Sequence, residues 1–370
     1  MKLASYNVEN LFRRARALNM ETWADGKEVL TKYTMLNGIF NKQAYTPADK
    51  RRIVQLMGEL GIDKKDDGSK FVILRQNKGK LVKRPQAGGL EVVANGRQDW
   101  VGWLDLKVDD VDDVATRNTA RVVKAIGADV LAVIEAENRP ALIRFSDSLL
   151  PAVEGTAYNH LMLIDGNDER GIDVGIMMRK QYEITRMNSH VDDADEKGRI
   201  FSRDCAEYWI RSQAGKELII LVNHLKSKGF GAKDDSDEKR LRQARRVAQL
   251  YKELTKAGNK NVAIVGDFND TPDSDALKPL LKQTDLRDVS ELANFDDGGR
   301  PGTFGNGTAA NKIDYILLSP ALFAKAKRGG IYRMGVWGGT NGDLFPHLPE
   351  ITKPSEAASD HAAIWAEIDI

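Results

Sequence analysis

The sequence contains a single cysteine, Cys205, among 370 residues. One cysteine excludes an intramolecular disulfide framework and any zinc site built from several thiolates. No run approaches the roughly 18 consecutive apolar residues of a membrane-spanning helix, and residues 1–7 lack the apolar stretch of a secretory signal. We therefore expect a cytoplasmic protein without a membrane partner, or a secreted one if a signal was removed before residue 1.

An excess of charge of one sign is also lacking, since 55 Lys and Arg stand against 54 Asp and Glu. This balance argues against a surface coated with basic residues for nucleic-acid binding. Two phosphate- and acyl-transfer motifs are missing as well, because no Gly-rich phosphate loop follows a strand and no Gly-x-Ser-x-Gly elbow occurs. We therefore expect a soluble folded protein whose chemistry uses neither a Gly-rich phosphate loop nor a Gly-x-Ser-x-Gly elbow.

The pattern that is present alternates helices with buried strands. Residues 116–126 carry apolar residues at helical spacing before Gly127, and 130–134 form a continuous apolar run typical of a strand buried on both faces. Further strands are expected near residues 3–7, 172–178, 209–210, 218–222, 262–265, 313–318 and 362–368, and a long helix at 237–257. The sequence predicts one α/β domain spanning 1–370.

Residues 13–115 follow a different pattern and predict an inserted α+β subdomain. Thr46-Pro47 opens a helix that runs to Gly61, and Phe71–Leu74 indicates a strand. Residues 90–93 and 100–103, joined across Asn95-Gly96, are typical of a hairpin. We expect Trp100 and Trp103 to share a strand face and to pack in a core, with stacking on a base as the alternative.

Polar residues follow most of the buried strands. They are Asn7, Glu9, Glu135, Asn223, His224, Asp267, Asn269, Asp314, Asp360 and His361. A charged group beside an apolar strand costs several kcal/mol unless it is paired or bound to a metal. One such residue could be a cap or a lone ion pair, but six groups on one rim of a sheet predict an active site.

The residue types indicate the chemistry. Carboxylate and amide oxygens without cysteines suit Mg²⁺, Mn²⁺ or Ca²⁺ better than zinc. Two histidines can donate hydrogen bonds to the charge that develops on a phosphorane. The set predicts metal-assisted attack of water on a phosphate ester.

The ordered motifs resemble those of the endonuclease/exonuclease/phosphatase superfamily. They are SYNVENLF at 5–12, DVLAVIE at 129–135, VNH at 222–224, GDFN at 266–269, KIDYI at 312–316 and SDH at 359–361. The resemblance covers residues 1–12 and 116–370 and leaves the insertion outside. It implies a four-layer α/β sandwich of two mixed sheets packed face to face, with helices outside.

The resemblance also implies roles for the site residues. Glu135, Asn7, Glu9 and Asp360 match metal-site positions, Asp267 matches the aspartate that orients or deprotonates the attacking water, and Asn269 steadies the phosphate. His361 matches the phosphate-binding histidine, Asp314 its partner, and His224 a second histidine for transition-state stabilisation or leaving-group protonation. Arg170, Asn223, Lys226 and Lys228 are expected to contact the substrate.

The forms IDYI and GDFNDTP look most like bacterial nuclease members, so we expect a Mg²⁺-dependent nuclease with DNA as its partner. A phosphatase or phosphodiesterase for a small or lipid ester, and an idle DNA- or protein-binding module, remain open. The near-zero net charge does not exclude DNA, because at least five acids are expected in one cleft and binding should weaken steeply with salt. Residues 233–239 are expected to form a solvated loop, and Arg240, Arg242, Arg245 and Arg246 a solvated helix face.

Overall fold

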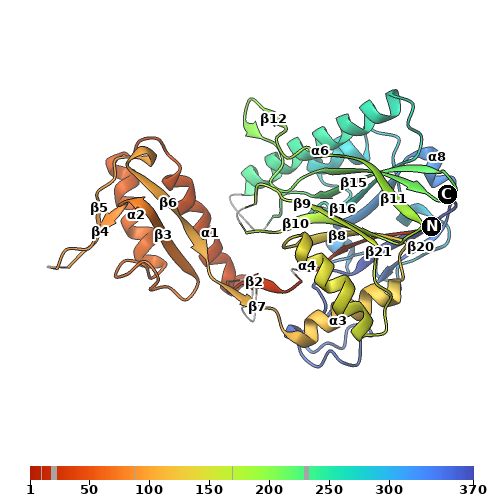
Figure 1. Cartoon of the computed structure of the whole chain (residues 1–370), viewed down its shortest axis with the longest axis horizontal. Helices are drawn as coiled ribbons and strands as arrows, with labels where there is room; N and C mark the ends of the chain where they lie inside the picture. The colour runs from red at the N-terminus through yellow and green to blue at the C-terminus, as the bar shows by residue number, and fades with distance from the viewer. Residues whose placement is uncertain (10, 18–22, 87, 169, 229–232) are drawn as a thin grey trace. The chain divides into compact units, whose positions relative to one another are not determined.

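The computed structural model describes residues 1–9, 11–17, 23–86, 88–168, 170–228 and 233–370. The chain forms two compact units (Figure 1). The larger unit comprises Met1–Phe12, Val111–Lys228 and 233–370, and the smaller unit comprises Arg13–Asp110. Residues 111–115, grouped with the insertion on sequence grounds, thus lie in the larger unit, where α3 begins at Asp113.

Two large sheets form the centre of the larger unit. The first has seven strands in the order β18 (Phe295–Asp296), β20 (Ala326–Tyr332), β21 (Ala363–Ile368), β1 (Lys2–Asn7), β8 (Val130–Ala136), β10 (Asp173–Met178) and β9 (His160–Ile164). The second has six, in the order β11 (Tyr182–Asn188), β14 (Ala206–Ser212), β15 (Glu217–His224), β16 (Val262–Asp267), β19 (Asp314–Leu318) and β17 (Arg287–Asp288). A short hairpin of β12 (Ala194–Asp195) and β13 (Gly198–Arg199) stands apart from both.

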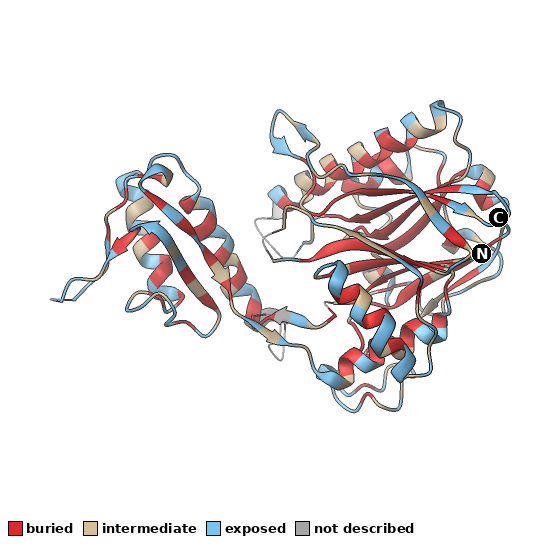
Figure 2. Ribbon diagram, viewed as in Figure 1, coloured by how far each residue is buried: buried red, intermediate tan, exposed pale blue. Residues whose placement is uncertain are grey.

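Three apolar layers separate four layers of secondary structure. One core lies between the sheets and joins residues such as Leu3 and Ile134 of the first to Val222 and Val265 of the second. A second core packs α3 (Asp113–Ile126) and α4 (Arg139–Arg144) on the first sheet, and a third packs α6 (Lys233–Lys256) and α7 (Lys278–Leu281) on the second. The buried strands between exposed helix faces are visible in Figure 2. The predicted four-layer α/β sandwich is confirmed. The short helices α5 (Leu150–Ala152) and α8 (Pro320–Phe323) complete this unit.

The N-terminal part of α6 corrects the sequence prediction. Residues 233–239 belong to the helix and do not form a loop. Arg240 is fully buried, with its Nε 2.8 Å from Asp270 Oδ2, while Arg246 pairs with Asp193 at 2.6 Å. Arg242 likewise pairs with Asp195, so Arg245 alone of the four arginines is exposed. The expected solvated arginine face was wrong.

The smaller unit has its own apolar core, formed by helices on one face of a two-stranded sheet. Its elements are β2 (Arg13–Ala15), α1 (Trp23–Phe40), α2 (Pro47–Glu59), β3 (Val72–Gly79), β4 (Val82–Lys83), β5 (Glu91–Val92), β6 (Trp100–Leu106) and β7 (Val108–Asp110). The predicted α2 is confirmed and begins with a capping box between Thr46 and Asp49. The long helix α1 was not predicted.

Two predictions within this unit were wrong. β5 pairs with β4, and β6 pairs with β3, so residues 90–103 do not form a hairpin. Trp100 and Trp103 lie three positions apart on β6, and strand side chains alternate between faces. Trp100 is therefore 1% exposed and Trp103 44% exposed. None of the described helices of either unit is long and apolar enough to span a bilayer.

Candidate active site

Strand pairing brings the polar strand ends to one edge of the sandwich. In the first sheet, β1 and β8 run parallel, with Asn7 beside Ile134, and His361 lies just before the antiparallel β21. In the second sheet, His224 pairs with Asp267 across parallel strands, and Asp267 pairs with Asp314 across antiparallel strands. Side chains two residues apart on a strand share a face, so these groups continue the faces that line the central core.

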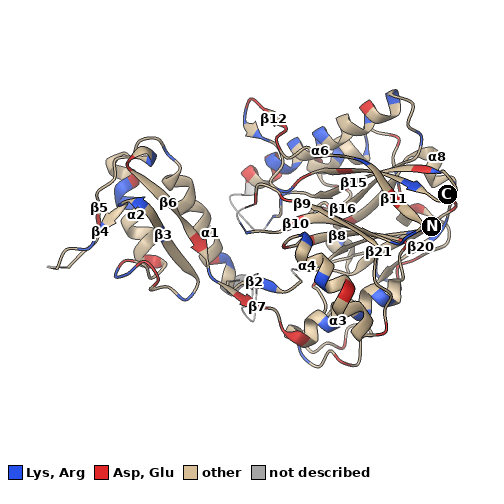
Figure 3. Cartoon of the chain, in the orientation of Figure 1, with Lys and Arg blue, Asp and Glu red and all other residues tan. Residues whose placement is uncertain are grey.

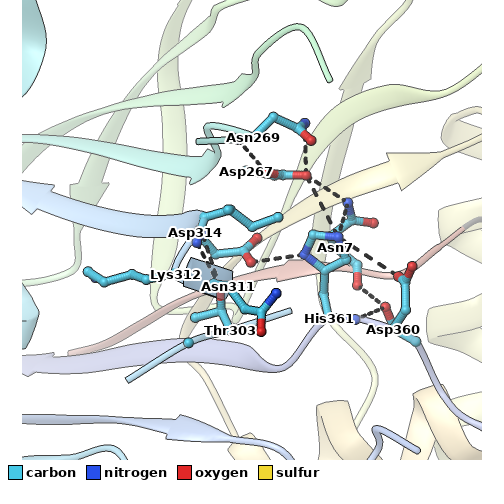
Figure 4. Close-up of polar contacts among 12 residues, drawn as sticks. Asn7, Asp267, Asn269, Thr303, Asn311, Lys312, Asp314, Asp360 and His361 are labelled. Carbon is cyan, nitrogen blue, oxygen red and sulfur yellow. Dashed lines mark hydrogen bonds and ion pairs between the residues drawn. The ribbon is translucent and has the colours of Figure 1, made fainter. Parts of the chain in front are cut away.

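Polar contacts connect the two sheets at this edge (Figure 4). Asn7 Nδ2 donates to Asp267 Oδ2 at 3.3 Å, and His361 Nδ1 lies 2.9 Å from Asp314 Oδ2. Ser359 supports the histidine, since its hydroxyl donates to the Asn7 carbonyl and accepts the His361 N–H. The structure therefore brings Asn7, Asp267, Asp314 and His361 together, as predicted.

His361 is held as an imidazolium. Burial opposes its charge, but the carboxylates of Asp314 and Asp267 outweigh burial and raise the pKa of His361 well above its usual range. With both ring nitrogens protonated, Nδ1 donates to Asp314. Nε2 lies 3.5 Å from Asn7 Nδ2, which is itself a donor, and 3.8 Å from both Asp267 Oδ2 and Asp360 Oδ1, so no carboxylate accepts from it at hydrogen-bond distance. This N–H is directed into the site and can donate to an anion.

Asp267 is a fully enclosed carboxylate with an altered proton affinity. Burial and the negative charge of Asp314 raise the pKa of Asp267 to about 7. Its oxygens accept the backbone N–H of Asn269 at 2.8 Å and the Asn269 amide at 3.1 Å. The same amide donates to the Leu225 carbonyl. Asn269 thus positions Asp267, and the predicted contact of Asn269 with phosphate stays a prediction.

The glycine of the GDFN motif is required by the backbone. Gly266 has φ 135°, a conformation that side chains rarely adopt, and a Cβ there would stand 1.9 Å from the Asn223 carbonyl oxygen. Only glycine therefore fits directly before Asp267, the last residue of β16.

Backbone strain concentrates at the site. Only four described non-glycine residues have positive φ, and three of them, Glu9, Glu135 and Asn269, belong to the predicted site. Such conformations cost about 1–3 kcal/mol each and persist where the surrounding structure imposes them. Glu135 is the extra residue of a bulge, because Val174 pairs with Ile134 and Asp173 with Ala136. The bulge turns the Glu135 side chain toward His224, whose Nε2 lies 3.5 Å from Glu135 Oε1.

His224 differs from His361 in charge. Its Nε2 also lies 3.5 Å from Asp267 Oδ2, but burial and the positive charges of Arg203 and Arg170 lower the pKa of His224 well below its usual range. Its Nδ1 is buried and has no hydrogen-bond partner in the described part of the chain. His224 is therefore a neutral imidazole beside an imidazolium.

The oxygen atoms at this edge fit a hard divalent cation. The side chain of Glu135 is 20% exposed, and its Oε1 lies 3.5 Å from His224 Nε2. Glu9 is tied to the edge, since its Oε2 accepts the Asp360 N–H and its own N–H donates to Asn7 Oδ1. Ligand atoms of Asp267, Asp314 and His361 lie within 4.8 Å of one another. Asp314 already accepts from His361 and is buried, whereas Glu135 is partly exposed, so the Glu135 carboxylate fits an ion better. The other predicted metal positions, Asn7, Glu9 and Asp360, are joined to one another by hydrogen bonds at the same edge.

A group of cations beside the site was only partly predicted. Arg203 is fully buried, with Nε 3.0 Å from Asp168 Oδ2, and Arg170 makes two hydrogen bonds to the same carboxylate. Burial opposes ionisation of Asp168, but Arg203 and Arg170 outweigh it and lower its pKa well below the usual range. Burial, Arg203 and Arg170 lower the pKa of Lys226 to about 7. Arg203 was missed because no regular strand or helix contains it.

Two predicted substrate contacts lie elsewhere. Asn223 is on the opposite face of β15 from His224, donates to the Leu221 carbonyl, and adjoins the core under α6. Lys228 forms an ion pair with Asp270, which also binds Arg240. The structure does not bring Asn223 to the site, and it directs the Lys228 charge to a structural carboxylate.

Comparison with known proteins agrees with this geometry. A mannosyl-6-phosphatase of Bacteroides thetaiotaomicron is similar at 19% identity and a TM-score of 0.51, covering 70% of this chain and 92% of that one. An endonuclease/exonuclease/phosphatase family protein of the same organism has 19% identity and a TM-score of 0.50, covering 68% and 86%. At these identities the similarity shows the fold alone. No curated protein matches the sequence significantly. The sequence profile described as "Endonuclease/Exonuclease/phosphatase family" matches residues 80–334, and the chain belongs to that family.

Proposed function

We propose that this protein is a divalent-metal-dependent phosphodiesterase that hydrolyses DNA. The observation that carries the proposal is the buried network Asn7–Asp267 and Asp314–His361, which joins the two sheets beside the Glu135 carboxylate. It combines a candidate base, a fixed cation and oxygen ligands within one site, as hydrolysis of a phosphate ester requires.

A bound Mg²⁺ would supply a Lewis acid that polarises a phosphate oxygen. Asp267 accepts a proton from the attacking water, and its pKa of about 7 suits a general base at neutral pH. His361 donates its Nε2–H to a phosphate oxygen and, as an imidazolium, stabilises the charge that develops there. His224 Nε2 lies 3.5 Å from Asp267 Oδ2 and from Glu135 Oε1, and we propose that this histidine hydrogen-bonds the reacting phosphate.

The surroundings of the site support a polyanionic ester over a lipid. Arg170 and Arg203 bind the carboxylate of Asp168, and we propose that these two guanidinium groups attract the phosphates of the substrate. Among the described residues of the larger unit, Met187 is the only exposed large hydrophobic side chain, so an apolar surface for lipid tails is missing there.

The same cations favour a second candidate, hydrolysis of a small phosphate monoester. A terminal phosphate carries nearly two negative charges and would be attracted by this group. The first-named similar structure is a phosphatase. Release of inorganic phosphate from sugar and inositol phosphates, measured beside DNA cleavage, separates the two candidates.

Nicking of supercoiled plasmid in Mg²⁺ and in EDTA tests the proposal. We expect nicking in Mg²⁺, none in EDTA, and a loss of at least about 10³-fold in Asp267→Asn and His361→Ala. His160→Ala is the matched control, since His160 is exposed on β9. Phosphate release from monoesters without nicking would replace the proposal by the second candidate.

A further inference from the structure

The sheet of the smaller unit has two unlike faces. Val72, Leu74, Trp100 and Leu104 face the core that α1 and α2 share. The opposite face carries Val101, which is 50% exposed, and Trp103, which is 44% exposed. A tryptophan is usually well buried, so an accessible indole on an open sheet face calls for a ligand with an apolar plane.

Each of these exposed side chains has a basic residue opposite it. The register of the antiparallel pair sets Arg75 against Trp103 and, beyond a bulge between Gln76 and Lys78, sets Lys78 against Val101. Directly opposite residues have Cβ atoms about 4.5–5.5 Å apart and lie on the same face. Arg75 shares its charge with Asp105, 3.4 Å away, whereas Lys78 has no carboxylate partner in the described part of the chain. The face therefore combines an aromatic plane with positive charge.

The smaller unit as a whole is also basic. Residues 13–110 contain 19 Lys and Arg against 13 Asp and Glu, while the remainder contains 36 against 41. The near-neutral total thus conceals a basic smaller unit and an acidic remainder. In Figure 3 the positions of Lys and Arg are blue on the ribbon of the smaller unit.

We propose that the face formed by Arg75, Lys78, Val101 and Trp103 binds an unpaired segment of DNA, with a base stacked on Trp103 and phosphates near Arg75 and Lys78. Single strands expose both a charged backbone and base planes, whereas a duplex covers its base planes by stacking. An acidic peptide would satisfy the cations but leave the indole without a planar partner. The choice of DNA over RNA rests on the proposed function.

Binding of a fluorescein-labelled 12-nucleotide poly(dT) to the full chain, followed by anisotropy in EDTA and 50 mM salt, tests this inference. We expect Trp103→Ala to weaken binding at least about fivefold, the loss that removing one stacked base gives, and Trp103→Phe to stay within about threefold. Lys78→Gln should reduce the slope of the logarithm of the binding constant against the logarithm of the salt concentration by about 0.7. Met35→Ala, which removes a hydrophobic side chain 47% exposed on α1, is the matched control and should bind as wild type.

The outcomes separate this inference from the proposed function, because EDTA removes cleavage from the binding measurement. Trp103-dependent binding by a protein that never nicks DNA would leave the inference standing and refute the function. Nicking with unchanged binding in a folded Trp103→Ala variant would do the reverse. A duplex bound as tightly as the single strand, or an oligo(U) bound at least tenfold more tightly than poly(dT), would overturn the assignment to unpaired DNA.

Discussion

Replacing Asp314 by asparagine tests how His361 keeps its charge. The two side chains are buried, with Asp314 Oδ2 2.9 Å from His361 Nδ1. Opposite unit charges about 4 Å apart interact by about 4 kcal/mol at an effective dielectric constant of about 20. The asparagine keeps the size of the side chain and removes this interaction. The imidazolium of His361 then loses its proton at lower pH.

Asp314 also raises the pKa of Asp267, so both limbs of the pH profile should move toward acid in Asp314→Asn. The acid limb follows ionisation of Asp267, and the basic limb follows deprotonation of His361. We expect the basic limb to move to lower pH and the rate at pH 8.5 to drop by at least about 100-fold, with a smaller difference near pH 6.

Plasmid nicking at saturating Mg²⁺ between pH 5.5 and 9 measures the profile. Asp288→Asn is the matched control, because Asp288 is a half-buried carboxylate that pairs with Lys312 at 2.9 Å on the same sheet. It should leave the profile in place. A uniform drop in the rate of Asp314→Asn, with both limbs unmoved, would refute the idea that Asp314 sets the charge of His361.

Two further predictions concern stability. Burial raises the pKa of Asp173 to about 7 from its ordinary 3.8, so the folded state loses stability as pH rises from about 4 through 7. Asp173→Asn keeps the hydrogen bond that the Gly166 N–H donates. In urea unfolding, the free energy of unfolding of this variant should exceed that of the wild type by about 1–2 kcal/mol at pH 8 and should equal it at pH 4. Arg240→Met should lose about 3 kcal/mol, because it leaves Asp270 buried without its guanidinium, while Arg245→Met on the exposed face of the same helix should change stability by less than about 0.5 kcal/mol. Equal losses in the two arginine variants, or a pH-independent gain at position 173, would contradict the respective argument.

Much of the fold could be predicted because its strands are continuous apolar runs. Residues 130–134 and 262–265 are buried on both faces, and such runs mark central strands of a sandwich without further context. The polar residues that follow them were found for the same reason, since a charged group next to such a run needs a partner.

The periods of strands and helices already indicate on which face Trp103 and Arg240 lie, and the predictions for these two residues did not apply them. Trp100 and Trp103 are three positions apart, and the two-residue period of a strand places them on opposite faces. Arg240 stands four residues before Ala244 and seven before Val247, so the helical period places it on the buried face of α6. Because Arg242, Arg245 and Arg246 follow closely in the sequence, Arg240 was assigned with them to a solvated face.

Other features depend on contacts between distant segments. Arg203 becomes a site residue because Asp168, 35 positions earlier, lies beside it, and neither has a local signal. The turn of Glu135 into the site depends on a bulge set by pairing with β10. No periodicity of the sequence contains these pairings, so they required the folded structure.

The Mg²⁺ dependence of plasmid nicking by wild-type protein and Glu135→Gln tests the central claim most directly. Glu135 offers a partly exposed carboxylate whose Oε1 lies 3.5 Å from His224 Nε2, and we propose that this carboxylate binds the ion. The account predicts saturable dependence on Mg²⁺, no nicking in EDTA, and at least about tenfold more Mg²⁺ for half-maximal rate in the variant. Nicking that persists in EDTA, or identical Mg²⁺ dependence of the two proteins, would contradict a metal-dependent phosphodiesterase centred on Glu135.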